Sequence, residues 1–117
     1  MLHQYEVPAY IACKLPQVKK ELSHPGSTLS AYQSMQVLTD YTKEMALQHN
    51  YIMVKKCMAI VETLYIKGNS LVRNAVENVF IFSFSSIMSS CNIVEWRMVQ
   101  SYMPTDLYAL YVQQVMR

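Results

Sequence analysis

Charged residues are scarce in this sequence, at 15% of its 117 residues against roughly 25% in an average globular chain. The usual scaling of surface with mass gives a folded surface of about 6,600 Å². Ten basic and eight acidic residues are too few to cover it. Uncharged polar residues could cover the rest, or a contiguous apolar patch could stay exposed and need a partner. The nine Met and nine Tyr residues, types that suit contact surfaces, favour the patch.

The sequence also lacks the features of several other protein classes. A net charge of +2 with a pI of about 8.4 is too mild to indicate a nucleic-acid or membrane-surface partner. The longest uncharged stretch, residues 78–94, would span about 26 Å as a helix. It holds five serines and two asparagines, so no membrane span is expected. No basic segment followed by an apolar core opens the chain, so no signal peptide is expected.

Cysteine usage indicates a reducing compartment. Cys13, Cys57 and Cys91 are an odd number of cysteines, lie far apart and form no C-x-x-C motif. Reduced, buried thiols in the cytoplasm fit this pattern best. Cys57 lies on the apolar stripe of a predicted helix, so we expect it in the core.

No pattern of catalytic or metal-binding residues is present. His3, His24 and His49 lie in separate segments, and no pair shows the i, i+4 spacing of a helical zinc site. With only two glycines, the chain has no glycine-rich phosphate loop. We therefore expect no metal, no cofactor and no catalytic residue. An active site assembled only in three dimensions, from Glu62, Arg73 and Glu77, stays open as an alternative.

Helical periodicity and capping signals follow one another along most of the chain. Pro16 suits the first turn of a short helix that His24-Pro25-Gly26 terminates. Ser30 with Gln33, and Asn92 with Glu95, form capping boxes. Residues 1–15 are expected to be irregular, undecided between strand and coil, because a proline there removes a backbone donor. The predicted helices are residues 16–22, 30–49, 51–67, 70–89, 92–102 and 105–116.

The stretch from residue 58 to residue 82 predicts a helix end, a sharp turn and a long buried helix. Gly68 would close the first helix in the left-handed conformation, and Asn69 or Ser70 would cap the next. Apolar residues cover most of the second helix, as expected where neighbours pack on several sides. The alternation of Phe80, Phe82 and Phe84 also fits a strand. Helix is preferred because no second strand is available to pair with it.

These elements predict an all-α fold in a single domain, residues 1–117. We expect a compact array of about five to six helices joined as antiparallel hairpins. Helices two to four could also stack as in a HEAT-like α-solenoid.

One polar cluster, Arg73, Asn74, Glu77 and Asn78, interrupts the apolar helix. Arg73 and Glu77 are one turn apart and can form an ion pair, and the two asparagines line an adjacent stripe. The preferred interpretation is structural: with Glu62, the cluster would be a polar network that ties the helix to its neighbours. The alternative is that these residues form the polar centre of a binding groove.

The stretch LYIKGNSLVRNAVENVFIFSFS, residues 64–85, combines a Lys-Gly-Asn turn with N-A-[IV]-E-N-V-F and an aromatic-Ser-Phe ending. Together with MPTDLYALYVQQV, residues 103–115, it resembles a family of small, uncharacterised helical proteins of bacteria, common in Bacteroidetes. The resemblance covers residues 55–117 and implies an α-helical fold without catalytic residues. Small single-domain proteins of this kind resemble immunity proteins encoded beside secreted toxins. Immunity proteins against nucleases are often strongly acidic, and this chain is not.

The sequence therefore predicts a non-catalytic module that binds another protein, most concretely a cytoplasmic immunity protein that blocks a cognate toxin. Aromatic residues are common anchors of such interfaces. Tyr41, Tyr51, Trp96 and Tyr102 are the predicted partner-binding residues. The alternatives are a homo-oligomer, with the patch buried against a second copy, and the enzyme described above.

Overall fold

The computed structural model describes residues 1–22, 30–84 and 92–115, apart from the side chains of Ile93, Trp96 and Val115. The chain is all-α, as predicted. In chain order its helices are η1 (Gln4–Glu6), α1 (Val7–Lys14), η2 (Pro16–Val18), α2 (Lys19–Leu22), α3 (Ala31–Leu47), α4 (Tyr51–Lys67), α5 (Ser70–Ala75), η3 (Val76–Ile81), α7 (Ile93–Tyr102) and α8 (Thr105–Val115). The elements η1 and η2 are 3-10 helices and η3 is a π-helix.

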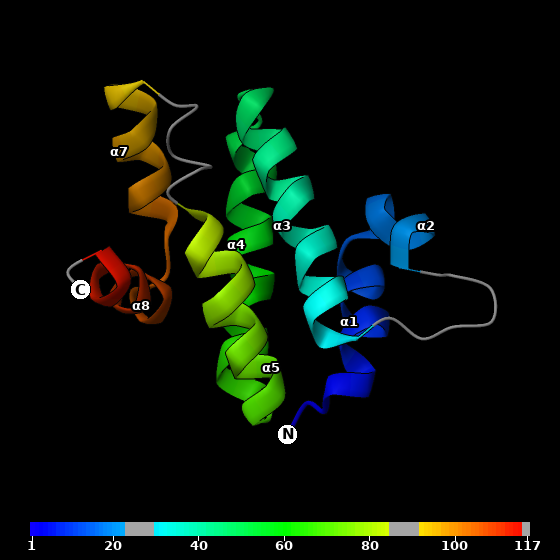
Figure 1. Cartoon of the computed structure of the whole chain (residues 1–117). Helices are drawn as coiled ribbons and strands as arrows, with labels where there is room; N and C mark the ends of the chain where they lie inside the picture. Colours follow the sequence, from blue (N-terminus) through cyan, green and yellow to red (C-terminus); the bar gives the residue numbers. More distant parts are fainter. Residues whose placement is uncertain (23–29, 85–91, 116–117) are drawn as a thin grey trace.

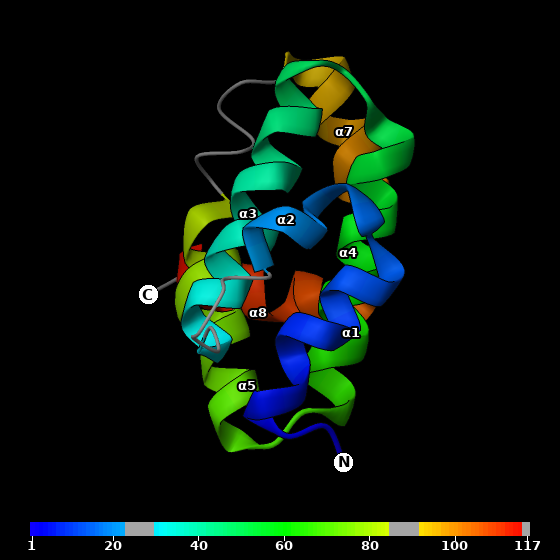
Figure 2. The same cartoon turned by 90° about the vertical axis from the view of Figure 1, so that its right-hand side faces the viewer.

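The helices lie in three layers (Figure 1). The middle layer contains α3, α4 and α5, with α1 and α2 on one side and α7 and α8 on the other. Residues 48–50 join α3 to α4, which lie side by side, and residues 68–69 join α4 to α5. In the view of Figure 2, α8 runs across the direction of α3 and α4. The middle layer is therefore covered on both of its faces.

The first fifteen residues are largely helical, so the prediction of irregular structure is wrong. Val7 and Pro8 open α1 and lie in its first turn. A missing N–H costs little there, because the first N–H groups of a helix have no partner within it. Val7, Ile11 and Leu15 recur every four residues and are fully buried. The proline thus starts a helix that the core holds in place.

Three predicted helix starts are confirmed by their capping hydrogen bonds. Ser30 Oγ accepts from the Gln33 N–H at 3.1 Å, and Gln33 Oε1 accepts from the Ser30 N–H at 2.9 Å. Asn92 and Glu95 exchange the equivalent pair at 2.8 and 3.2 Å. Asn69 Oδ1 accepts from the first turn of α5 at 3.1 Å. Each cap satisfies backbone donors that a helix leaves unpaired at its start.

The turn between α3 and α4 lies where the sequence predicts it. The structure gives α4 the predicted bounds, Tyr51–Lys67. His49 has a φ of 60°, in the left-handed region. The Asn50 N–H donates to the Met45 carbonyl at 2.8 Å, which satisfies one of the last carbonyls of α3. Here a histidine rather than a glycine takes the left-handed position.

Gly68 does not take the left-handed conformation, so that prediction is wrong. Its φ of −77° and ψ of 154° are extended and open to any residue. The turn needs glycine for space. A Cβ at this position would lie 2.5 Å from Val72 Cγ1 and still closer to the Leu64 carbonyl oxygen. The chain can pass between the end of α4 and the start of α5 only where no side chain is present.

Residues 70–84 form one helical run, which confirms the helix over the alternative strand. Its middle part, η3, has the wider π geometry. Gln114 of α8 donates from Nε2 to the Glu77 carbonyl oxygen at 2.8 Å. The predicted burial on several sides holds only in part, because Leu71 and Phe82 are exposed. These two residues lie at positions that neighbouring helices leave uncovered.

Some predicted boundaries lie outside the described residues. They are the helix end at His24-Pro25-Gly26, the end of the fourth helix at Ser89-Ser90-Cys91, and residues 116–117. Where the chain is described on either side, α2 ends at Leu22 and α8 extends to Val115.

The core fills both faces of the middle layer. The largest fully buried side chains include Ile11, Leu15, Met35, Leu38, Met58, Leu64, Phe80, Ile81, Phe84 and Leu107. Phe84 meets Tyr111 edge to face, with centroids 5.0 Å apart, and so holds α8 to the middle layer. Cys57 is buried as predicted, whereas Cys13 is exposed and corrects the expectation for that thiol.

Candidate functional site

The N-terminal segment is tied by hydrogen bonds to the turn between α4 and α5. The Leu2 N–H donates to the Lys67 carbonyl at 2.6 Å, and the Asn69 N–H donates to the Leu2 carbonyl at 2.8 Å. Asn69 Nδ2 donates to Gln4 Oε1 at 2.5 Å. Figure 2 shows this meeting of the N-terminus with the turn at one end of the molecule. These contacts hold the N-terminal residues against a turn more than sixty positions away in sequence, and so determine the shape of the surface at this end.

Beside this tie lies a mostly apolar hollow of about 390 Å³. Its lining residues are Gln4, Tyr5, Ser30, Ala31, Tyr32, Gln33 and Leu71. Tyr5 is 75% exposed, Tyr32 43% and Leu71 49%. A group of exposed apolar side chains around a concave surface is typical of a binding site.

A second hollow, of about 620 Å³, opens at the same end of the molecule. It is lined by Met1, Leu2, Ile66, Lys67, Gly68 and Arg73. Met1 and Ile66 are exposed apolar residues, and Lys67 and Arg73 add two cations. We call the lining of these two hollows the end surface.

Arg73 is held by Tyr65 and not by Glu77, so the predicted ion pair is wrong. The guanidinium carbon lies 4.7 Å from the centroid of the Tyr65 ring. The Nη2 atom of Arg73 donates to Tyr65 Oη at 3.3 Å, which raises the pKa of the guanidinium. Arg73 is exposed, where an ion pair one turn away contributes little and an aromatic face can compete for the cation.

The predicted polar network does not assemble. Among the described residues, no hydrogen bond or ion pair joins Glu62, Arg73, Asn74, Glu77 and Asn78 to one another. Asn74 and Asn78 are exposed, and Glu62 and Glu77 are half-buried. Asn78 Nδ2 donates to the hydroxyl of Tyr32 at 3.1 Å and so supports one wall of the apolar hollow.

The predicted aromatic anchors lie away from the end surface. Tyr41, Tyr51 and Tyr102 are partly buried and pack against the core. Burial raises the pKa of the Tyr41 phenol. The side chain of Trp96 lies outside the part of the chain that the structure describes. The exposed residues Tyr5, Tyr32 and Leu71 were not among the predicted anchors. The position of Tyr32, beside the apolar stripe of α3 and not on it, is the sequence signal that could have identified it.

A carboxylate cluster joins α7 to the turn between α3 and α4. Glu95 Oε2 accepts from the Tyr51 hydroxyl and also contacts His49 Nδ1. Its Oε1 accepts from the Asn92 N–H at 3.2 Å. The only sequence signal for Glu95 was its capping box with Asn92. That motif does not show that Glu95 Oε2 reaches residues more than forty positions away. In an enzyme, a carboxylate in this position can orient a histidine that acts as a general base. Here Oε1 caps α7 itself and Oε2 joins α7 to Tyr51 and His49, so we interpret the cluster as an interhelical connection.

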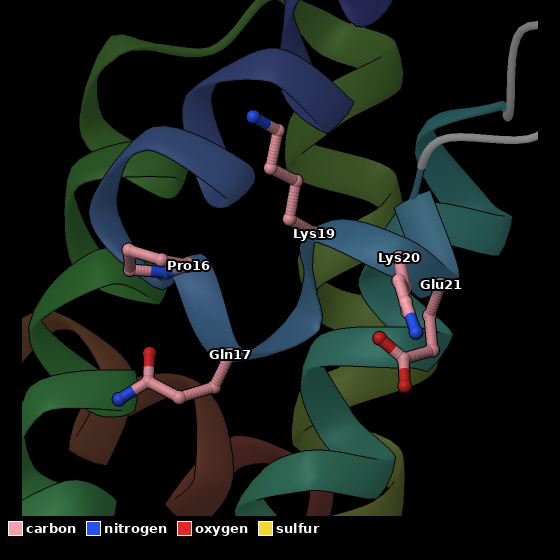
Figure 3. Close-up of a pocket in the computed structure, with 5 residues that line it drawn as sticks. All are labelled: Pro16, Gln17, Lys19, Lys20 and Glu21. Carbon is pink, nitrogen blue, oxygen red and sulfur yellow. The ribbon is translucent and has the colours of Figure 1, made fainter.

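Another hollow, of about 530 Å³, lies over the segment from Pro16 to Glu21 (Figure 3). Figure 3 shows Lys19 and Gln17 pointing in different directions, and Lys20 beside Glu21. Its lining has charges of both signs and no aromatic residue. The side chains do not converge on a common point, so this hollow is a weaker candidate than the end surface.

The described residues hold no group of three His, Cys, Asp or Glu side chains that could bind a metal ion. Within the same part of the chain, none of the helices combines the length and the apolar character needed to cross a bilayer.

Burial raises the pKa of the Cys57 thiol, although Thr42 and Lys56 oppose the shift. This thiol is therefore a poor nucleophile.

Comparison with curated proteins gives no match, and neither does comparison with solved structures. A family model does match, and the match covers nearly the whole chain. It includes most of the first fifty residues, where the sequence shows no recognisable motif. Over residues 8–117 the chain matches the domain of unknown function DUF7674, and it belongs to this uncharacterised family.

Proposed function

We propose that this chain is a non-catalytic protein–protein interaction module and that it binds its partner with the end surface. The observation that carries the proposal is the group of exposed Tyr5, Tyr32 and Leu71 side chains around one apolar hollow. Exposed apolar groups of this kind mark interaction sites on small proteins. Aromatic side chains at such a site also lose little conformational entropy on binding.

The size of the molecule is compatible with this role. A specific interface takes about 800 Å² from each partner, and the whole surface here is 6709 Å². About an eighth of the surface would therefore be covered, an area that one end of the molecule can supply. The hydrogen bonds of Leu2 and Asn69 hold this end in one conformation, which reduces the entropy lost on binding.

In its most concrete form, the proposal is that the chain is a cytoplasmic bacterial immunity protein that neutralises a cognate toxin. The small helical fold, the apolar end surface and the resemblance over residues 55–117 support this form. A net charge of +2 argues against a nuclease blocked by mimicry of nucleic-acid charge. The toxin would instead be held mainly by apolar contacts.

The test is co-expression with the protein encoded by the neighbouring gene. We expect the two proteins to co-purify and the chain to relieve any growth defect that its neighbour causes. Leu71→Asp should abolish both effects, because it places a charge at the wall of the apolar hollow. Ile52→Asp is the matched control, since Ile52 is 82% exposed at the opposite end of α4. Loss of binding with Ile52→Asp and not with Leu71→Asp would show that another surface binds the partner.

A second copy of the chain is the alternative partner. Leu47, Ile52, Phe82 and Val94 are exposed in addition to the end surface, so more than one face could take part in self-association. Light scattering at micromolar concentration separates the two possibilities. The mass of one chain supports a different partner, whereas a dimer that Leu71→Asp dissociates supports self-association.

The enzymatic alternative needs Glu62, Arg73 and Glu77 to act together. It requires Glu77→Gln to abolish an activity without lowering the melting temperature. We expect no activity to depend on Glu77, because these side chains do not contact one another.

A further inference from the structure

The charges of the end surface are all of one sign. Among the side chains that line its two hollows, only those of Lys67 and Arg73 are charged, and both are cationic. Glu6 is adjacent in sequence, but its carboxylate accepts from the His3 N–H at 3.3 Å. Glu77 lies one turn beyond Arg73 and attracts its guanidinium at longer range, but the two make no direct ion pair. The second hollow therefore presents two side-chain cations that no lining carboxylate neutralises, at the same end of the molecule as the apolar hollow.

Arg73 is already oriented for binding. Tyr65 holds its guanidinium by a cation–π contact and by one hydrogen bond at 3.3 Å. A guanidinium has five N–H donors, so most of them remain for a ligand. Carboxylates are favoured ligands because they can accept two of these donors in parallel.

From this arrangement we infer that the end surface binds an amphipathic, acidic segment of a partner protein. Apolar side chains of the segment would fill the hollow between Tyr5, Tyr32 and Leu71, and an Asp or Glu would pair with Arg73 and Lys67. This inference rests on the proposed function and specifies the chemistry of the partner. A protein segment is favoured over a nucleic acid because two cations beside an apolar hollow give a weak electrostatic footprint.

Selection from a library of random linear peptides displayed on phage, with the purified full chain as bait, tests the inference. We expect the enriched peptides to combine aromatic or aliphatic residues with Asp or Glu. Synthetic copies should bind more weakly as ionic strength rises, because the charged contact is near the surface. Enriched peptides without carboxylates, no enrichment at all, or displacement of the peptides by single-stranded RNA would each overturn the inference.

Variants then show where the peptides bind. Arg73→Glu should weaken binding about tenfold or more, as expected for reversal of a charge at an interface. A peptide whose Asp or Glu is replaced by Lys should recover binding to Arg73→Glu. Lys67→Glu provides a second charge reversal in case the first variant folds poorly by circular dichroism. Lys56→Glu is the charge-matched control, since Lys56 is exposed elsewhere on α4 and should leave binding unchanged.

The outcomes separate the inference from the proposed function. If Leu71→Asp abolishes peptide binding and neither charge reversal changes it, the inference of an acidic partner is wrong. The proposal that the end surface binds a partner is then still supported. If none of the three variants changes binding, the end surface is not the binding site, and both proposals fail.

Discussion

Ser34 is a buried residue whose hydroxyl has no hydrogen-bond partner among the described residues. It lies on α3 and is fully buried, so its Oγ loses water without compensation. Ser34→Ala should raise the free energy of unfolding by about 1 kcal/mol, from the relieved desolvation and the better helix propensity of alanine. Urea unfolding measures the change. Ser70→Ala, at an exposed position of α5, is the control and should give a smaller gain. An equal gain in the two variants would contradict the burial argument.

The two described cysteines should differ in reactivity. Cys13 is exposed, whereas Cys57 is buried and its burial raises the pKa of the thiol. Because only the thiolate reacts, a Cys91→Ala variant should show one thiol that reacts quickly with a disulfide reagent at mildly alkaline pH. A second thiol should react only after denaturation. Two fast thiols in the native protein would show that the core around Cys57 opens readily.

At the scale of elements, the turn between α4 and α5 depends on the absence of a side chain at Gly68. Gly68→Ala should destabilise the protein by about 1–3 kcal/mol, the usual cost of forcing atoms into a packed site. Gly68→Asn distinguishes the reasons for glycine. A left-handed site would tolerate asparagine better than alanine, but this extended, crowded site should tolerate it no better. Thermal unfolding of the two variants makes the comparison.

The position of α7 depends on the Glu95 cluster. Tyr51→Phe removes the hydroxyl that donates to Glu95 and should cost about 1.5 kcal/mol, as for a hydrogen bond to a charged group. Tyr102→Phe is the control, since its ring lies beneath Lys55 and its hydroxyl has no hydrogen-bond partner among the described residues. Hydrogen exchange of the α7 amides should be faster in Tyr51→Phe only. Equal exchange in both variants would show that other contacts position α7.

Local sequence signals predicted most of the helices. They did not predict conformations and contacts that depend on how the helices pack against one another. Capping boxes such as Ser30 with Gln33 depend on neighbouring residues, so their positions can be read from sequence. The conformation of Gly68 depends on how closely α4 approaches α5, which no local pattern shows. Arg73 contacts Tyr65 and not Glu77 for the same reason. Both residues are near Arg73 in sequence, and the packing of α5 against α4 determines which of them its side chain reaches.

At the scale of the whole molecule, a chain with few charged residues leaves apolar side chains on its surface. Large apolar residues are exposed in several places, with Tyr5 and Leu71 at one hollow and Phe82 apart from it. The sequence predicted that apolar surface would remain exposed but not where. The predicted anchors Tyr41, Tyr51 and Tyr102 pack against the core, while the N-terminal residues, predicted to be irregular, form one wall of the candidate site. Their role depends on hydrogen bonds to residues 67–69, too distant in sequence to foresee.

The exposed apolar residues should limit solubility and add little to stability. The double variant Tyr5→Gln, Leu71→Gln should precipitate at higher ammonium sulfate concentration than the parent chain. Its free energy of unfolding should change by no more than about 0.5 kcal/mol for each substitution, as is usual at exposed positions. Lys56→Gln is the control and should leave solubility unchanged. A large loss of stability would show that Tyr5 and Leu71 support the fold.

The anchoring of Leu2 on both sides of Gly68 also determines where an attached label would lie. A small fluorophore coupled to the amino group of Met1 would lie at the rim of the second hollow. Its emission should therefore change when a partner binds in that hollow. A bulky affinity tag fused at the same point would obstruct the opening and weaken capture of the partner.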